Sequence, residues 1–105
     1  MAIITHNKLV RDKIPEVIKN DGKICDTEIL SDDDYLAMLD KKLDEELNEY
    51  YKDKNIEELA DLVEVIYAVA EARGYSLEQL ESVRKEKVEK RGAFKEKIFL
   101  KTVRD

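Results

Sequence analysis

The chain has 105 residues, of which 43% are apolar and 42% charged, and its 25 acidic and 19 basic side chains give a formal net charge of −6. At this length we expect a single domain over residues 1–105, with a small core. Three glycines and one proline are too few for the turns of a β-sandwich or barrel. The composition therefore predicts an all-α fold.

Several protein classes are excluded by the residue pattern. Leu, Ile and Val recur at helical intervals, which argues against a disordered chain. No apolar run approaches the roughly 18 to 20 residues that span a bilayer, and no signal-peptide apolar region is present, so we expect a soluble cytoplasmic protein with no membrane partner. One Cys and one His cannot supply the ligands of a zinc site, so any metal must be held by carboxylates.

Charge is unevenly distributed along the chain. Residues 26–64 carry 15 acidic and 4 basic groups, whereas residues 84–105 carry 9 basic and 4 acidic groups. One interpretation is that acidic and basic helices of one bundle attract each other. The other is a site for a metal-bound polyphosphate, which needs carboxylates for the cation and basic side chains for the phosphates.

The N-terminal third contains short elements. We expect an irregular arm over 2–9 and a short helix over 12–20, with Pro15 tolerated in its first turn. Asp21 and Gly22 end that helix, and residues 23–30 are expected to be extended.

Two long helices follow. Ser31 and Asp34 resemble a helix N-cap and predict a helix over 31–53, and Asn55 and Gly74 delimit a second helix over 56–73. The second helix has the wider apolar face, so it is predicted to be the better buried of the two, or to lie in a subunit interface. The apolar stripes are Leu36, Leu39, Leu43, Leu47 and Tyr50 in the first helix, and Leu59, Leu62, Val63, Ile66, Val69 and Ala70 in the second.

A third helix and a tail complete the chain. Ser76 and Gln79 form a capping-box pattern, and the helix is expected to run to Lys90 and stop at Gly92. The remaining residues, 93–105, alternate apolar and basic side chains. They are predicted to form a tail that packs over the bundle.

Paired carboxylates flank the turn between the two long helices. Glu46 and Glu49 share one helical face, as do Glu58 and Asp61 on the next helix. A short turn near Lys54 makes the helices an antiparallel hairpin, so all four carboxylates are predicted to meet across it. Such repulsion calls for a cation, and Mg²⁺ prefers oxygen ligands and bridges carboxylates to phosphates.

A purely solvated acidic face is the alternative. Glu residues at this spacing are common on exposed helices, and the pattern alone does not separate the two interpretations. A di-iron carboxylate site is excluded because it needs Glu-x-x-His pairs, and His6 lies in the arm.

The runs EELNE and EELADLVEVIYA resemble the Glu-x-x-Glu and Glu-x-x-Asp signature of the MazG-like, all-α nucleotide pyrophosphohydrolases. The opening NKLVRDKIPEVI and the closing KVEKRGAFKEKIFL resemble the phosphoribosyl-ATP pyrophosphohydrolase-like subgroup. The resemblance implies a helical bundle built on the hairpin, with short N- and C-terminal extensions. It also implies Mg²⁺-dependent hydrolysis of a nucleoside triphosphate to the monophosphate and pyrophosphate, with removal of non-canonical nucleotides as a role.

Site residues follow from the resemblance by position. Metal ligands would be Glu46, Glu49, Glu58 and Asp61, with Mg²⁺ or Mn²⁺ as the ion, and Glu45 or Glu49 would accept the proton of the attacking water. The phosphate-binding set would be Lys87, Lys90 and Arg91, joined by Lys8 and Arg11. For Arg11, a structural ion pair that ties the arm to the bundle is an equal alternative. Only eight residues separate Glu49 from Glu58, which predicts a tight turn and leaves the substrate's base and sugar open.

The chain is also expected to form an oligomer, and two other functions are considered. Members of the family are usually oligomers, and a helix apolar over much of its circumference predicts a homodimer or homotetramer. The rival function is a non-enzymatic helical interaction module with an acidic solvated face. Nucleic-acid binding is disfavoured by the net negative charge and by acidic residues interleaved in the basic ends.

Overall fold

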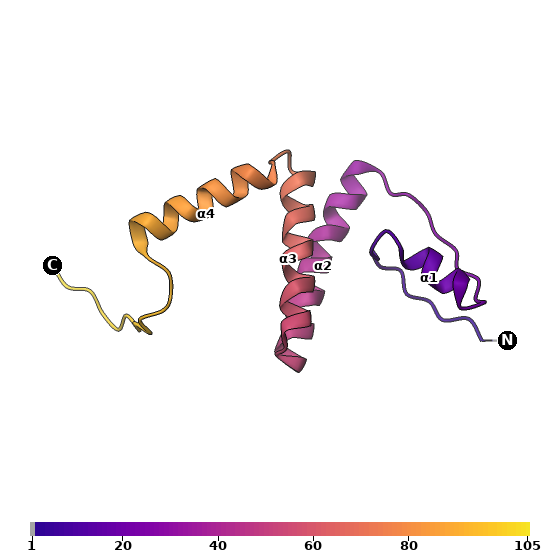
Figure 1. Cartoon of the computed structure of the whole chain (residues 1–105), viewed down its shortest axis with the longest axis horizontal. Coiled ribbons are helices and arrows are strands. Elements are labelled where there is room, and N and C mark those ends of the chain that lie inside the picture. Colours follow the sequence, from indigo (N-terminus) through magenta and orange to yellow (C-terminus); the bar gives the residue numbers. More distant parts are fainter. Residues whose placement is uncertain (1) are drawn as a thin grey trace.

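The computed structural model describes residues 2–105 and is all-helical over that range, with no β-strand in it. Four helices follow one another along the chain (Figure 1). Their bounds are Ile14–Asn20 for α1, Asp32–Asp53 for α2, Ile56–Ala72 for α3 and Leu77–Arg91 for α4. Each predicted helix is thus present, with ends that differ by at most two residues from the sequence-based limits.

The helices begin where the sequence supplies capping side chains. The Ser31 hydroxyl accepts a hydrogen bond from the Asp34 backbone N–H at 3.3 Å, and the Asn55 side chain accepts one from Glu58 N–H at 3.0 Å. Ser76 opens α4 with a complete capping box. These contacts satisfy amide groups that have no partner within the helix.

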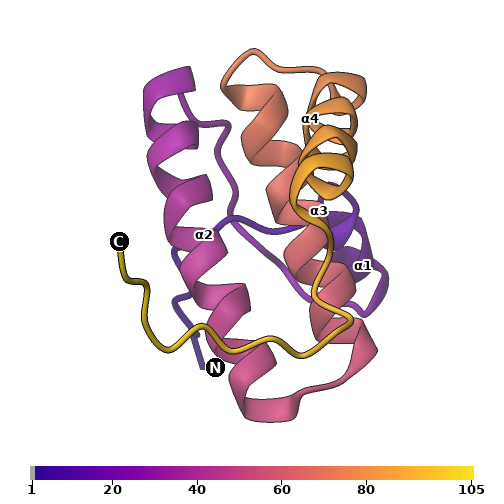
Figure 2. The same ribbon diagram turned by 90° about the vertical axis from the view of Figure 1, so that its left-hand side faces the viewer.

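The two long helices, α2 and α3, pack side by side as an antiparallel hairpin (Figure 2). Lys54 forms the turn in the left-handed conformation, with φ of 50° and ψ of 37°. Leu39 of α2 and Ala70 of α3 are buried, and Asp40 pairs with Arg73 at 3.1 Å near the open end. The hairpin therefore carries the core of the chain.

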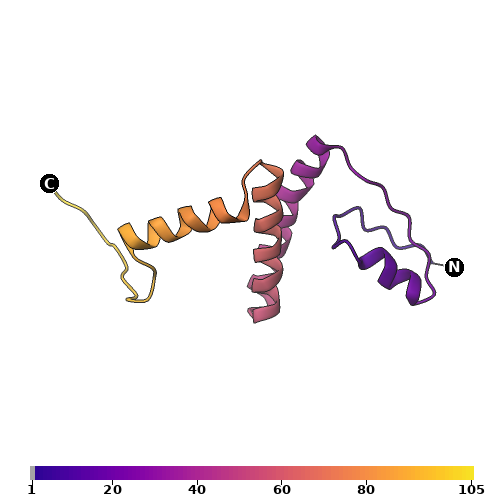
Figure 3. The ribbon, with the colours of Figure 1, turned by 45° about the horizontal axis from the view of Figure 1, so that its top comes forward.

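The fourth helix leads away from this hairpin. It contacts α3 but not α2, and its axis runs outward from the hairpin in Figures 1 and 3. Every residue from 82 to 105 is exposed. The prediction that the C-terminal tail packs over the bundle is therefore wrong for the single chain, because α4 carries the tail away from the hairpin.

The apolar face of α3 is also uncovered. Leu59, Val63 and Ile66 retain 46%, 43% and 38% of their exposure. The prediction that α3 is the better buried long helix is wrong within one chain, because α2 covers one side of α3 and α4, which also contacts α3, leads away from the rest of it. The chain is therefore elongated and measures 66 × 31 × 24 Å. Its radius of gyration is 18.5 Å, whereas a compact chain of this length has a radius of gyration of about 13 Å.

The N-terminal segment makes a small unit beside the hairpin. Leu9, Ile14 and Ile18 are half-buried, and residues 23–29 run exposed toward α2. Among residues 2–105, no helix is both long and apolar enough to cross a membrane.

The turn residues can be tested by two substitutions with opposite effects. Lys54→Gly should raise the free energy of unfolding by up to about 1 kcal/mol, because glycine adopts positive φ without a Cβ clash. Asn55→Ala should lower it by about 1 kcal/mol, because the cap of α3 is lost. Urea unfolding at one fixed protein concentration measures both. Equal shifts in the same direction would contradict the role of the turn.

Candidate metal centre

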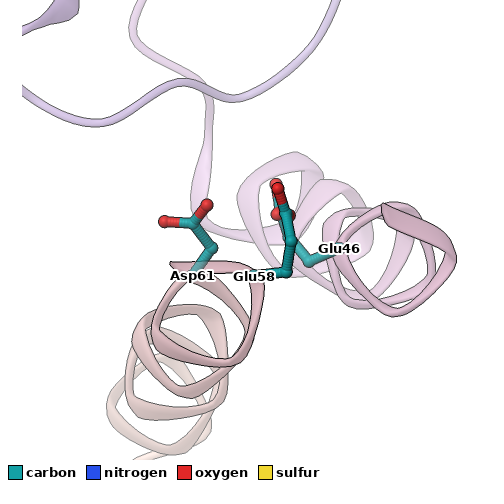
Figure 4. A group of neighbouring side chains, drawn as sticks. All are labelled: Glu46, Glu58 and Asp61. Carbon is teal, nitrogen blue, oxygen red and sulfur yellow. The ribbon is translucent and has the colours of Figure 1, made fainter. Parts of the chain in front are cut away.

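Three of the four carboxylates predicted as metal ligands come together near the turn. Glu46 of α2 and Glu58 and Asp61 of α3 each offer an oxygen, and these oxygens lie within 4.8 Å of one another. All three residues are half-buried, and their side chains stand on the same side of the hairpin (Figure 4). The pairing of α2 with α3 thus positions the group, as the sequence predicts.

The fourth predicted ligand, Glu49, lies in an adjoining group. Its carboxylate is within 4.8 Å of those of Asp53 and Glu58, and both Glu49 and Asp53 are exposed. Glu58 belongs to both groups. The carboxylates therefore form a continuous row along the helix interface, with Glu58 at its centre.

The surroundings of Glu58 destabilise the ionised form of its carboxyl group. Partial burial raises the pKa of its carboxyl above the ordinary value of 4.5, and the nearby charges of Asp61, Asp53, Glu49 and Glu46 raise it further. Its place in the first turn of α3 favours the ionised form. The pKa is therefore raised by partial burial first and by the neighbouring carboxylates second.

Lysine side chains partly neutralise the α2 carboxylates. Lys42 Nζ lies 3.3 Å from a Glu45 oxygen and 3.2 Å from a Glu46 oxygen, and its side chain is 17% exposed. Lys8 of the N-terminal arm approaches the same Glu45 oxygen at 3.7 Å. Glu45 is therefore held by two cations.

Arg11 is paired directly with a predicted metal ligand. Its Nη2 donates a hydrogen bond to Asp61 Oδ1 at 2.6 Å. The alternative interpretation of Arg11, as an ion pair that ties the arm to the hairpin, is thus present in the structure. The pair also places a guanidinium at the edge of the carboxylate row.

The basic residues of α4 do not reach the carboxylates within one chain. Lys87, Lys90 and Arg91 lie in the exposed part of α4, which has no contact with α2. Lys90 instead pairs with Glu86 of its own helix at 2.8 Å. Only Lys8 and Arg11 of the predicted phosphate-binding set lie at the site.

Two site residues were missed by sequence reasoning. Lys42 was detectable, because it precedes Glu46 by four residues and so lies on the same helical face. Asp53 also follows Glu49 by four residues, but its nearness to Glu58 depends on the path of the turn. Glu64, three residues beyond Asp61, is exposed and outside both carboxylate groups.

The carboxylate spacing fits a magnesium ion. Mg²⁺ takes oxygen ligands at about 2.1 Å in an octahedron, so oxygens on opposite sides lie about 4.2 Å apart. For Glu46, Glu58 and Asp61 to reach that arrangement, Asp61 must release Arg11 and Glu46 must release Lys42. Three carboxylates leave ligand positions for water and phosphate oxygens.

Comparison with known proteins gives one partial relative. A protein of Mycolicibacterium smegmatis described as uncharacterized is 55% identical over 42 residues, which are 40% of this chain and 43% of that protein. The match therefore spans less than half of either chain. No family model and no solved structure matches the sequence.

The raised pKa of Glu58 predicts a pH-dependent stability. In the metal-free protein, folding disfavours the ionised form of the Glu58 carboxylate. The resulting loss of folding stability is absent below about pH 4.5 and reaches its full size above the raised pKa. Glu58→Gln should raise the melting temperature at pH 7, and the gain should vanish on acidification below pH 4.5.

Glu57→Gln is the matched control, because Glu57 lies in the same first turn of α3 but outside both carboxylate groups. It removes the favourable dipole interaction without relieving repulsion, so it should not stabilise the protein. Equal gains for both variants in EDTA would contradict the assignment of repulsion to Glu58.

Proposed function

We propose that this chain is a Mg²⁺-dependent nucleotide pyrophosphohydrolase of the MazG-like type, which converts a nucleoside triphosphate to the monophosphate and pyrophosphate. The observation that carries the proposal is the convergence of Glu46, Glu58 and Asp61 from two helices at spacings suited to one cation. The sequence resemblance points to the same residues. Removal of non-canonical nucleotides is the role that this proposal includes.

The carboxylates and the hairpin each have a role in the proposed chemistry. A bound Mg²⁺ would neutralise the triphosphate and lower the pKa of a bound water. Glu46, Glu58 and Asp61 would hold the ion, and Mn²⁺ would fit the same oxygen donors. The hairpin fixes these ligands on two rigid helices, which orients the phosphate chain for in-line attack.

Glu49 is the better of the two candidates for accepting the water's proton. Glu45 is engaged by Lys8 and Lys42. Glu49 is exposed beside Glu58 and has no ion pair within residues 2–105. A carboxylate that is free of cations and next to the proposed ligands suits a general base.

Phosphate oxygens would be bound first by the N-terminal arm. Lys8 and Arg11 already lie beside the carboxylates, so a phosphate chain at the proposed metal would meet both. Lys87, Lys90 and Arg91 remain part of the proposed phosphate-binding set. Because α4 leads away from its own hairpin, they would serve that role from a neighbouring chain.

A homodimer or homotetramer belongs to the same proposal. Leu59, Val63, Ile66 and Tyr67 recur on one side of α3 and are 38% to 46% exposed. A stripe of this kind is expected to be buried against another helix. Sedimentation velocity at micromolar concentration should give at least twice the mass of one chain, and a monomer would contradict it.

Pyrophosphate release from a panel of ordinary and modified nucleoside triphosphates tests the activity. Release should require Mg²⁺ or Mn²⁺, and Glu46→Gln or Asp61→Asn should lower kcat/KM by at least about 100-fold, because one metal ligand is lost. Glu64→Gln is the matched control on α3 and should retain activity, since Glu64 lies outside both carboxylate groups.

Calorimetric titration with Mg²⁺ separates a failure to bind metal from a failure to hydrolyse the nucleotides. Metal binding without hydrolysis would preserve the metal centre and reject the nucleotide substrates in the panel. Neither metal binding nor hydrolysis would favour the alternative, a non-enzymatic helical interaction module whose acidic face is merely solvated.

Arg11→Gln should affect metal and nucleotide binding in opposite directions. Without nucleotide, the variant should bind Mn²⁺ more tightly than the natural chain, because Asp61 no longer has to release a guanidinium. With nucleotide, KM should rise several-fold, because a phosphate partner is lost. Electron paramagnetic resonance of free Mn²⁺ measures the first effect and steady-state kinetics the second. Unchanged Mn²⁺ affinity would contradict the competition.

A further inference from the structure

The C-terminal segment over residues 93–105, here called the C-terminal arm, has no partner within its own chain. Phe94, Ile98, Phe99, Leu100 and Val103 are 73% to 99% exposed. Lys95, Lys97, Lys101 and Arg104 are interleaved with them, and the arm carries a net charge of +2. So much exposed apolar surface beside basic groups is typical of a segment that binds an acidic, apolar surface.

The hairpin offers a surface with the complementary character. An open groove of about 580 Å³ has an apolar floor formed by Leu43, Leu47 and Leu62, with Asp40, Lys41 and Asp44 as its remaining lining. Residues 32–73 hold 14 acidic and 5 basic side chains. Asp44 has no ion pair within residues 2–105, although it lies beside the apolar floor.

We propose that the C-terminal arm of one chain docks in this groove on the hairpin of a second copy. Ile98 and Leu100 would cover the leucine floor, and Lys101 would lie against the carboxylate of Asp44. Reciprocal exchange of two arms makes a closed dimer, because each chain supplies one arm and one groove. The inference rests on the homo-oligomer of the proposed function but not on its hydrolase activity.

The path of α4 selects a second copy over the same chain. The arm begins after Gly92, at the end of α4 that is remote from α3, and α4 is about 22 Å long. In Figure 2 the arm passes in front of the hairpin, but Figure 1 shows that the two are well separated. With α4 in this orientation, the arm is directed toward a neighbour rather than back to its own groove.

The surface area of the chain is sufficient for such an exchange. The accessible surface is 10167 Å² for a mass of 12.3 kDa, whereas a compact monomer of that mass exposes about 6,100 Å². The excess is about 4,000 Å². A standard protein interface removes about 800 Å² from each partner, so arm exchange and α3 pairing together would bury about 1,600 Å² per chain, which lies well within the excess.

Disulfide pairing between two differently labelled chains tests the docking directly. Both chains carry Cys25→Ser, since Cys25 is a free exposed thiol. One carries Lys101→Cys and the other Asp44→Cys, and they are mixed, oxidised mildly and separated without reductant. A mixed disulfide dimer is expected in high yield. The matched control replaces Asp44→Cys with Asp33→Cys, an exposed position in the first turn of α2 outside the groove.

Equal yields with Asp33→Cys, or no dimer with either, would overturn the inference. A single chain that carries both Lys101→Cys and Asp44→Cys tests whether the groove is occupied by the arm of the same chain. If it closes an internal disulfide as a monomer, the arm folds back onto its own hairpin and the proposal of a second copy is wrong.

Sedimentation equilibrium measures what the arm contributes to assembly. The triple variant Phe94→Ser, Ile98→Ser, Leu100→Ser should raise the dissociation constant at least about 1,000-fold, because three buried apolar side chains are lost. Glu96→Ser with Asp105→Ser changes the same arm without removing apolar groups and should not weaken assembly.

The two proposals fail in different ways. A monomeric natural chain would reject the homo-oligomer and the arm exchange together. An oligomer whose dissociation constant is unchanged in the triple variant would reject the arm exchange alone. No pyrophosphate release from the natural chain, with the mixed disulfide still formed, would reject the hydrolase proposal and leave the docking intact.

Discussion

The antiparallel pairing of α2 with α3 is the constraint on which the rest of the structure depends. The left-handed turn at Lys54 joins the helices with a single residue between Asp53 and the Asn55 cap, so the last turns of α2 face the first turns of α3. Both regions are acidic. The turn that makes the hairpin therefore also brings like charges together, and their repulsion adds to partial burial in raising the pKa of Glu58.

Three cations lie against these carboxylates. Lys42 lies on α2 itself, but Lys8 and Arg11 come from the N-terminal arm and engage α2 and α3 respectively. The Lys8 and Arg11 pairs are exposed and contribute little to stability individually. Their importance lies in position, since they hold the arm at the carboxylates, where the proposed phosphates would need positive charge.

Local signals predicted the elements well and the tertiary arrangement only in part. Capping residues such as Ser31, Asn55 and Ser76 act within a few positions, so their helices could be placed from sequence. The meeting of Glu46 with Glu58 and Asp61 was predictable because a short turn leaves one way to pair two helices. Asp53 was missed because its place beside Glu58 depends on the exact course of that turn.

The direction of α4 could not be predicted in the same way. The apolar residues between Phe94 and Val103 indicate that the C-terminal arm packs against another surface. A sequence pattern does not indicate whether that surface belongs to the same chain or to another copy. In the structure α4 contacts α3 alone and carries the arm outward, which supports the proposed exchange with a second copy. Leu39 and Ala70 are the only buried apolar residues in the part of the chain that the structure describes, so the core of one copy is small. If the proposed oligomer covers the exposed apolar faces, the stability of the carboxylate row should depend on protein concentration.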